Sequence, residues 1–310
     1  MKQYALVRKI ATGGMAEVFL AHNAQKKAVV IKRILPHLAS DLEYVKMFQN
    51  EFGILSKLRH PHIVRVMEVH HDYAVMEYLE GQDWRSISQY PISQKVLIAL
   101  FVKALEVLAY VHDLGIIHRD ISPQNWMLTL GGDVKLLDFG ISKMENQTNH
   151  TATGVLKGKY GYMSPEQAAG EKISCLSDIF SMGVILFEFC TQSRLFKRSN
   201  DLLTLKSILA CEVEVPAHIP AALGDILKQA LAKDQDRRFQ SCEEFRTALL
   251  DYGRENRLIA SQMEVVDFVN RLPRLNNRVL FEATQASLPQ KNLYFMGVLA
   301  LAFGLLGMGW

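Results

Sequence analysis

The feature of this sequence that most constrains its fold is a change of apolar pattern near residue 80. Before that point, short runs rich in apolar and β-branched residues predict strands at residues 4–10, 18–21, 28–34, 63–69 and 73–76. One segment of helical spacing, at residues 42–58, lies among them and stops before Pro61, where proline cannot continue a helix. The first part of the chain therefore predicts a small lobe made of strands and a single helix.

After residue 80 the apolar residues recur at helical spacing. The predicted helices cover residues 96–114, 179–190, 202–209, 224–232 and 242–252. Gly115 follows the first of them, at a position where glycine commonly ends a helix. We therefore predict an α+β chain with a β-rich lobe at residues 1–80 and a larger helical lobe at residues 81–252.

Charge and cysteine content argue against several classes of protein. A formal net charge of +3 over 310 residues, without blocks of like charge, gives no electrostatic footprint for nucleic acid. The four cysteines lie far apart and form no CxxC pair, which favours reduced cytosolic thiols over disulfides or a zinc site. The N-terminal sequence MKQYALVRKI lacks the apolar stretch of a secretory signal.

A glycine-containing turn joins the first two predicted strands. Residues 10–18 read IATGGMAEV, to be compared with the phosphate-binding pattern G-x-G-x-x-G-x-V. Gly13 and Val18 match it, whereas Ala11 and Ala16 stand at the other two glycine positions. The backbone of such a loop can approach phosphates, and an ordinary hairpin is an equally good interpretation.

A lysine ends the next strand, in the run VVIK at residues 29–32. Lys32 is either a surface lysine or one held inside by a carboxylate, and the expected partner is Glu51 on the predicted helix. Paired with Glu51, its ammonium group would face the α- and β-phosphates of a nucleotide.

Two further motifs follow in the helical part. Residues 118–125 read HRDISPQN, and residues 134–140 read VKLLDFG. Asp120 is suited to orient a substrate hydroxyl and accept its proton, while Asn125 and Asp138 offer oxygen ligands for Mg²⁺. Each motif alone could arise by chance, but the full set in this order indicates phosphoryl transfer from ATP.

Together these motifs resemble the protein kinase superfamily, and most closely the bacterial eukaryotic-like Ser/Thr protein kinases. The resemblance runs from about residue 4 to residue 252, and it includes SPE at residues 164–166 and DIFSMG at residues 178–183. It implies a bilobal protein kinase fold, protein substrates, ATP, and Mg²⁺ with Mn²⁺ as a possible substitute. It also implies an ion pair between Arg238 and Glu166.

The resemblance further implies a nucleotide site around the hinge-like sequence VMEYL at residues 75–79, with Met76 as gatekeeper. The residues implied to bind the nucleotide are Ile10, Ala11, Gly13, Ala16, Val18, Val30, Lys32, Met76, Glu77, Leu79 and Met127. For the apolar members the competing interpretation is core packing, and the kinase fold allows both.

Two positions depart from the family pattern. Ser122 stands where the resemblance implies a lysine that contacts the γ-phosphate, and Lys159 stands where it implies a threonine. We hypothesise that Lys159 supplies the missing charge; the alternative is an exposed loop lysine that contacts acidic substrates. The catalytic residues are then Asp120, Lys32, Glu51, Asn125 and Lys159. The alternative class is a pseudokinase scaffold, which binds nucleotide or partners without turnover.

Arg119 and the threonines after Asp138 suggest control by phosphorylation. In the family such an arginine pairs with a phosphate on the activation loop. The candidate sites are Thr148, Thr151 and Thr153, of which the last two are preferred. Autophosphorylation in trans would bring two copies together as a homodimer, and the competing interpretation is a loop whose threonines have no such role.

The last part of the chain divides into two segments. Residues 253–292 predict a helical extension, with an amphipathic helix at residues 264–272, followed by a basic juxtamembrane linker. Residues 293–310 contain no charged residue, and as a helix they would reach roughly 27 Å, near the shortest span of a bilayer. A single transmembrane helix there would hold the kinase domain at the cytoplasmic face of the cell membrane. The alternative is a buried or interfacial helix.

Overall fold

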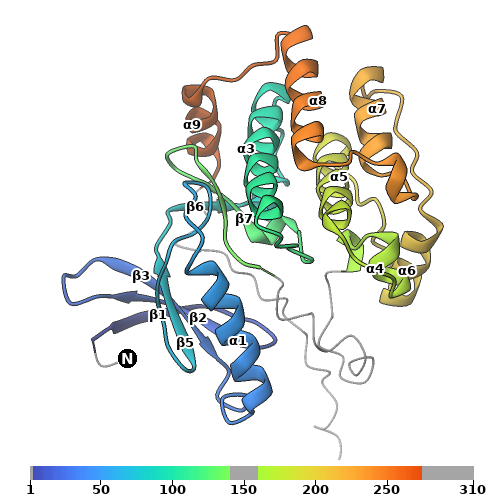
Figure 1. Ribbon diagram of the computed structural model, residues 1–310. Helices are drawn as coiled ribbons and strands as arrows, with labels where there is room; N and C mark the ends of the chain where they lie inside the picture. Colours follow the sequence, from blue (N-terminus) through green and yellow to red (C-terminus); the bar gives the residue numbers. More distant parts are fainter. Residues whose placement is uncertain (1–2, 140–159, 274–310) are drawn as a thin grey trace, which may run out of the picture.

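The smaller lobe is built on a five-stranded antiparallel sheet with the strand order β1-β2-β3-β5-β4. Its strands are β1 (Ala5–Thr12), β2 (Ala16–His22), β3 (Ala28–Ile34), β4 (Val66–Val69) and β5 (Tyr73–Glu77). The computed structural model describes residues 3–139 and 160–273. Figure 1 shows this lobe beside the larger helical one, so the predicted two-lobed architecture is confirmed.

Strand β3 decides which side chains of the smaller lobe face the nucleotide site. Its residues alternate between the two faces of the sheet, as in any strand. Val29 and Ile31 pack in a small cluster on one face, whereas Val30 belongs to the main core on the other. Lys32, two residues after Val30, therefore points to the same face as Val30, toward helix α1.

Helix α1 (Leu42–Leu55) covers that face of the sheet. Asp41 caps its first turn by accepting a hydrogen bond from the Glu43 backbone N–H, and Phe52 and Leu55 are buried beneath it. The helix ends at Leu55, whereas the apolar spacing predicted an end at residue 58. Leu58 is still buried in the core, so its apolar character comes from packing after the helix has ended.

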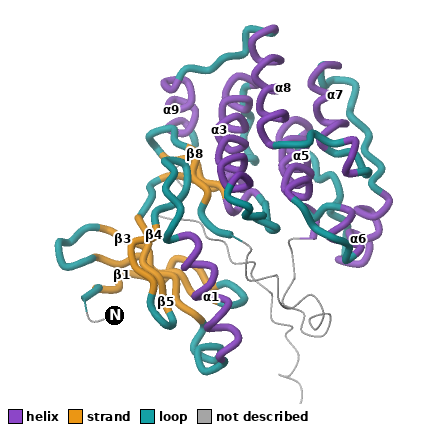
Figure 2. The backbone as a smooth tube through the Cα atoms, viewed as in Figure 1, coloured by secondary structure: helices purple, strands orange, loops and turns teal. Residues whose placement is uncertain are grey.

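The larger lobe is helical, and Figure 2 shows how little strand it contains. Its helices are α2 (Trp84–Ile87), α3 (Gln94–Asp113), α4 (Pro165–Ala169), α5 (Cys175–Thr191), α6 (Asp201–Ala210), α7 (Ala221–Ala230), α8 (Cys242–Glu255) and α9 (Gln262–Arg271). All the predicted helices of this lobe are present. Helices α2 and α4 were not predicted, because one turn of helix is too short to show an apolar period.

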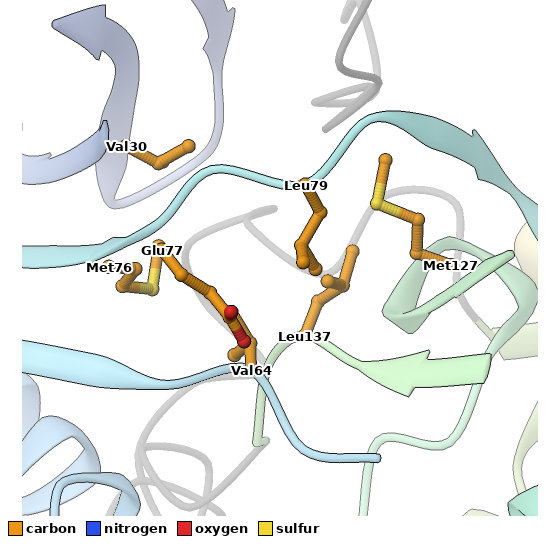
Figure 3. Close-up of a pocket in the computed structure, with 7 residues that line it drawn as sticks. All are labelled: Val30, Val64, Met76, Glu77, Leu79, Met127 and Leu137. Atoms are coloured by element: carbon orange, nitrogen blue, oxygen red, sulfur yellow. The ribbon is translucent and has the colours of Figure 1, made fainter. Parts of the chain in front are cut away.

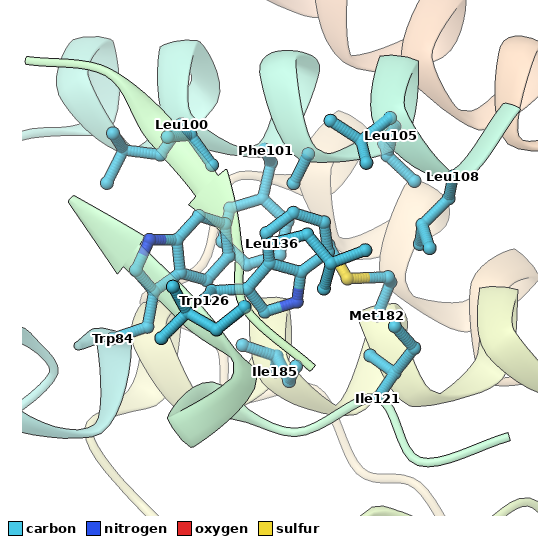
Figure 4. Packing of buried hydrophobic residues seen from close by; sticks show 14 of the residues in the cluster. Trp84, Leu100, Phe101, Leu105, Leu108, Ile121, Trp126, Leu136, Met182 and Ile185 are labelled. Carbon is cyan, nitrogen blue, oxygen red and sulfur yellow. The ribbon is translucent and has the colours of Figure 1, made fainter. Parts of the chain in front are cut away.

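The core of the larger lobe lies around helices α3 and α5. Figure 4 shows Trp84 and Trp126 side by side beneath Phe101 of α3, and the two indole rings stack with centroids 5.4 Å apart. All three side chains are fully buried. Aromatic packing of this kind fixes the position of α3, and with it the loop that follows α3.

A second sheet of three short strands, β6 (Gly81–Asp83), β7 (Trp126–Thr129) and β8 (Val134–Leu136), lies at the junction of the lobes. Gly81 is required there, since a Cβ at this position would come within 2.2 Å of the Leu128 carbonyl oxygen. The sheet was not predicted as such. It matters for the site because residues 118–125 lead into β7 and Asp138 follows β8.

Helix α9 confirms the amphipathic helix predicted after residue 252. It packs against α3 through buried Val265 and Val269. In the described ranges, residues 3–139 and 160–273, no helix combines the length and the apolar character that a membrane span requires. The transmembrane helix predicted at residues 293–310 lies outside those ranges.

Candidate active site

The loop of residues 118–125 connects α3 to β7 and is organised around a buried histidine. The His118 ring stacks on Phe139, with centroids 4.8 Å apart. Its Nε2 lies 2.5 Å from the Asp138 carbonyl oxygen and therefore donates, while Nδ1 accepts from the Asp120 backbone N–H at 3.2 Å. Burial lowers the pKa of His118, which favours this neutral form. His118 thus joins the HRD and DFG motifs through one imidazole.

Arg119 has a left-handed backbone, with φ of 66°. Such a conformation is unfavourable for a residue with a Cβ unless its surroundings hold it. The buried carboxylate of Asp178 accepts hydrogen bonds from the backbone N–H groups of His118 and Arg119, both at 2.8 Å. It also lies 2.8 Å from His112 Nε2. The first residue of α5's DIFSMG motif thereby fixes the turn directly before Asp120.

Asp120 is followed by a short 3₁₀ turn that Asn125 closes. Asn125 Nδ2 donates to the Asp120 carbonyl oxygen at 2.7 Å, and the amide oxygen Oδ1 is the atom whose chemistry suits a metal. Ser122 is only 1% exposed, and its hydroxyl has no hydrogen-bond partner among the described residues. The loop therefore brings Asp120 and Asn125 together, as predicted, around a buried serine.

Lys32 lies between two carboxylates. Its Nζ is 2.7 and 2.6 Å from the two Asp138 oxygens and 3.6 Å from Glu51 Oε1. Burial alone would lower the pKa of Lys32, but the attraction of Asp138 and Glu51 outweighs it and leaves that pKa raised. The predicted partner Glu51 is present at longer range. The closer partner, Asp138, was predicted only as a metal ligand.

A small apolar pocket opens between the lobes next to the hinge. Figure 3 shows its lining side chains, which are Val30, Val64, Met76, Glu77, Leu79, Met127 and Leu137. Five of them were predicted for the nucleotide site, and Val64 and Leu137 were missed. The signals were present, since Leu137 directly precedes Asp138 and Val64 lies in a predicted strand segment. The Glu77 carboxylate accepts hydrogen bonds from Arg65 N at 2.9 Å and Lys135 Nζ at 3.0 Å.

The other predicted nucleotide residues lie in or next to the β1–β2 hairpin. Val18 pairs with Lys32 across strands β2 and β3, so sheet register brings it to the site. The Gly13 N–H donates to the Ala16 carbonyl oxygen at 2.7 Å and closes the turn. Ile10 and Ala11, on β1, are partly buried against the main core. These residues are not among those that line the pocket.

The ion pair expected between Arg238 and Glu166 is confirmed. Two guanidinium nitrogens of Arg238 donate to the two carboxylate oxygens of Glu166 at 2.8 and 2.9 Å, and both side chains are buried. Burial opposes ionisation of Glu166, but hydrogen bonds from Arg238 and Ser177 lower its pKa overall. The pair ties the end of the SPE motif to the segment before α8.

The chemistry of Asn125 and Asp138 fits Mg²⁺, a hard cation that takes a few protein oxygens beside phosphate oxygens. Within the described part of the chain, no group of three or more His, Cys, Asp or Glu residues could hold a metal by itself. The predicted residues Lys159, Thr148, Thr151 and Thr153 lie outside the described residues.

Comparison with known proteins places these features in a family. The model for the protein kinase domain matches residues 4–263. Tyrosine-protein kinase MasK of Myxococcus xanthus is 40% identical over 272 residues, which cover 79% of this chain and 42% of MasK. Serine/threonine-protein kinase PknB of Mycolicibacterium smegmatis is 32% identical over 265 residues, which cover 80% of this chain and 42% of PknB. Serine/threonine-protein kinase PrkC of Bacillus subtilis is 30% identical over 298 residues, which cover 91% of this chain and 46% of PrkC. The chain therefore spans less than half the length of these relatives.

Proposed function

The chain belongs to the protein kinase family, and we propose that it transfers the γ-phosphoryl group of ATP to Ser or Thr hydroxyls of proteins. The observation that carries this proposal is the position of Lys32, whose Nζ lies between Glu51 and Asp138. These residues come from a strand, a helix and a loop far apart in sequence. Lysine and two carboxylates in this arrangement are suited to hold a polyphosphate and its metal.

In this proposal each residue has a separate task. Asp120 orients the acceptor hydroxyl and takes its proton, while Lys32, oriented by Glu51, binds the α- and β-phosphates. Asn125 and Asp138 are the residues that would hold Mg²⁺, or Mn²⁺ in its place. When bound, the ion would neutralise phosphate charge.

The adenine ring would bind at the hinge pocket, against Val30, Met76, Leu79 and Met127. Support comes from the apolar lining of that pocket and its position beside Glu77, whose carboxylate is occupied by Arg65 and Lys135. The hinge backbone from Glu77 to Leu79 then supplies polar contacts. Ile10, Ala11, Gly13, Ala16 and Val18 would cover the nucleotide from the β1–β2 hairpin.

Phosphotransfer with labelled ATP tests the proposal. The native chain should label itself or a general protein substrate, and Asp120→Asn should lower the rate by at least about a hundredfold, as expected for loss of a positioned base. Equal labelling by both would refute the role of Asp120. A folded native chain without labelling would favour the pseudokinase scaffold. Phosphoamino-acid analysis would distinguish Ser/Thr from Tyr, the acceptor in the name of MasK.

We further propose that Lys159 supplies the charge that Ser122 lacks. The buried Ser122 side chain supports this, because it brings no cation to the loop. Lys159→Ala should lower kcat far more than it changes KM for ATP, since the charge acts in the transition state. Lys157→Ala is the matched control. In a Lys159→Thr background, Ser122→Lys should restore activity, and an unchanged kcat in Lys159→Ala would contradict the hypothesis.

Two regulatory features complete the proposal. Thr151 and Thr153, and less so Thr148, would be phosphorylated in trans by a second copy and then paired with Arg119. Mass spectrometry of active protein should find phosphate on them, and its absence from all three would contradict this role.

Residues 293–310 would anchor the chain in the cell membrane with residues 1–252 in the cytoplasm. Membrane fractionation with and without residues 293–310 tests that anchor.

A further inference from the structure

Helix α4 sends one side chain back to the loop that contains Asp120. The Gln167 amide donates from Nε2 to the Arg119 carbonyl oxygen at 2.9 Å. Its Oε1 accepts from the Ser164 backbone N–H at 3.0 Å and from the Ser164 hydroxyl at 3.3 Å. Because both ends of the amide are bonded, its orientation is fixed, and Nε2 is the end that faces the loop.

The carbonyl oxygen that accepts from Gln167 belongs to Arg119, the residue with left-handed backbone directly before Asp120. Asp178 of α5 already fixes the N–H of Arg119, so the backbone of this one residue is bonded on both sides, by two different helices. The next carbonyl, of Asp120, is bonded to Asn125. Rotation of the Arg119–Asp120 peptide would break the Gln167 bond. The direction of the Asp120 side chain therefore depends on where α4 lies.

We propose that Gln167 is a positioning residue, which couples the place of helix α4 to the orientation of Asp120. The inference rests on the proposed phosphotransfer and adds a residue to it. Helix α4 lies near the start of the second described range, residues 160–273, and the buried Arg238–Glu166 pair anchors it in the larger lobe. Gln167, next to Glu166, extends this anchorage to the catalytic loop.

The competing role for Gln167 is helix capping alone. Gln167 and Ser164 form a capping box, in which each side chain accepts a hydrogen bond from the other's backbone N–H. Gln167→Glu separates the two roles. The carboxylate keeps the size of the side chain and still accepts from Ser164, but it cannot donate to the Arg119 carbonyl oxygen. A residue that serves only as a cap would tolerate this change.

A matched control exists in the same lobe. Gln262 on α9 also donates from Nε2 to a backbone carbonyl oxygen, that of Gly131, at 2.8 Å, and accepts from Lys103 at 2.9 Å. Its donor bond has the same chemistry as that of Gln167, although its oxygen accepts from an ammonium group and not from a serine, and neither bond reaches residues 118–125. Gln262→Glu therefore removes one glutamine donor bond without touching the loop.

The experiment measures kcat, KM for ATP and thermal unfolding for the native chain, Gln167→Glu, Gln167→Leu and Gln262→Glu. Loss of the Gln167 bond should lower kcat about tenfold with KM for ATP unchanged, at a temperature where every variant is folded. Gln262→Glu should keep native kcat. A kcat within twofold of native for Gln167→Glu, or an equal fall in Gln262→Glu, would overturn the inference. Absence of activity in the native chain would instead show that the proposed function itself fails.

Discussion

Replacing Glu166 by Gln should destabilise the protein by about 3 kcal/mol, because it leaves a buried guanidinium without its counter-ion. The Arg238 side chain is 0% exposed and that of Glu166 is 2% exposed, so water cannot replace the lost carboxylate. A glutamine keeps one acceptor for Arg238 but turns an NH₂ group toward the other guanidinium nitrogen. The loss is a large share of the roughly 5–15 kcal/mol that stabilise a typical domain.

Arg238→Met should be more harmful still. Besides Glu166, the guanidinium donates to the carbonyl oxygens of Ala232, Lys233 and Leu176, at 2.8, 3.0 and 3.0 Å. Methionine leaves these acceptors unsatisfied, at about 1–3 kcal/mol for each that water cannot reach. For the same reason, combining Arg238→Met with Glu166→Met should not restore stability, although paired apolar replacement of buried ion pairs is often tolerated elsewhere.

Urea unfolding, followed by tryptophan fluorescence, measures these changes as shifts in midpoint at constant slope. The exposed pair Arg254–Asp251 is the matched control, with side chains 67% and 55% exposed. Arg254→Met should change stability by less than about 0.5 kcal/mol. A loss below about 1 kcal/mol for Glu166→Gln, or a smaller loss for Arg238→Met than for Glu166→Gln, would refute the reasoning.

Two further predictions concern single residues. Burial lowers the pKa of His118, so as the pH falls its imidazole is protonated in the unfolded chain at a higher pH than in the folded one. The free energy of unfolding should therefore decrease as pH drops below about 6.5. In His118→Phe this part of the pH dependence should vanish, and equal urea-midpoint shifts between about pH 7.5 and about pH 5.5 in both proteins would contradict it. Gly81→Ala should cost more than about 2 kcal/mol, since its Cβ would meet the Leu128 carbonyl oxygen at 2.2 Å. Gly53→Ala, with nothing within 4 Å and in a helix, should be neutral or stabilising in the same unfolding assay.

Sequence patterns predicted those elements that bury many apolar residues over a long enough segment. The strand at residues 28–34 has the predicted bounds, because its β-branched residues fill both faces of a central strand. The end of α1 was placed three residues late, since Leu58 stays in the core after the helix ends. Strands β6, β7 and β8 are three or four residues long, and so short a segment has no measurable period.

The motif residues were found from sequence, but the contacts among them were only partly predictable. We predicted Glu51 as the partner of Lys32 and Asp138 only as a metal ligand, whereas Asp138 is the closer of the two carboxylates. Which carboxylate lies closer to Lys32 depends on the side-chain conformations of Lys32 and Asp138, which are 106 positions apart in the sequence. The pair Arg238–Glu166 was predictable because both members occupy fixed motif positions. Gln167 was missed, since its donor reaches a backbone carbonyl oxygen and no side-chain pairing signals such a bond.

The contacts around residues 118–125 change how the departure at Ser122 is understood. The backbone of this loop is held by His118, Asp178, Gln167 and Asn125, and the Ser122 side chain makes none of these bonds. Residue 122 contributes through its backbone, because its carbonyl oxygen accepts from the Asn125 N–H at 3.0 Å. The hydrogen bonds that hold the loop therefore do not depend on which side chain residue 122 carries. With serine at this position the bonds around Asp120 are all formed, and what the residue does not supply is a positive charge. That charge can be supplied by a cation from another segment, which is what the Lys159 hypothesis requires.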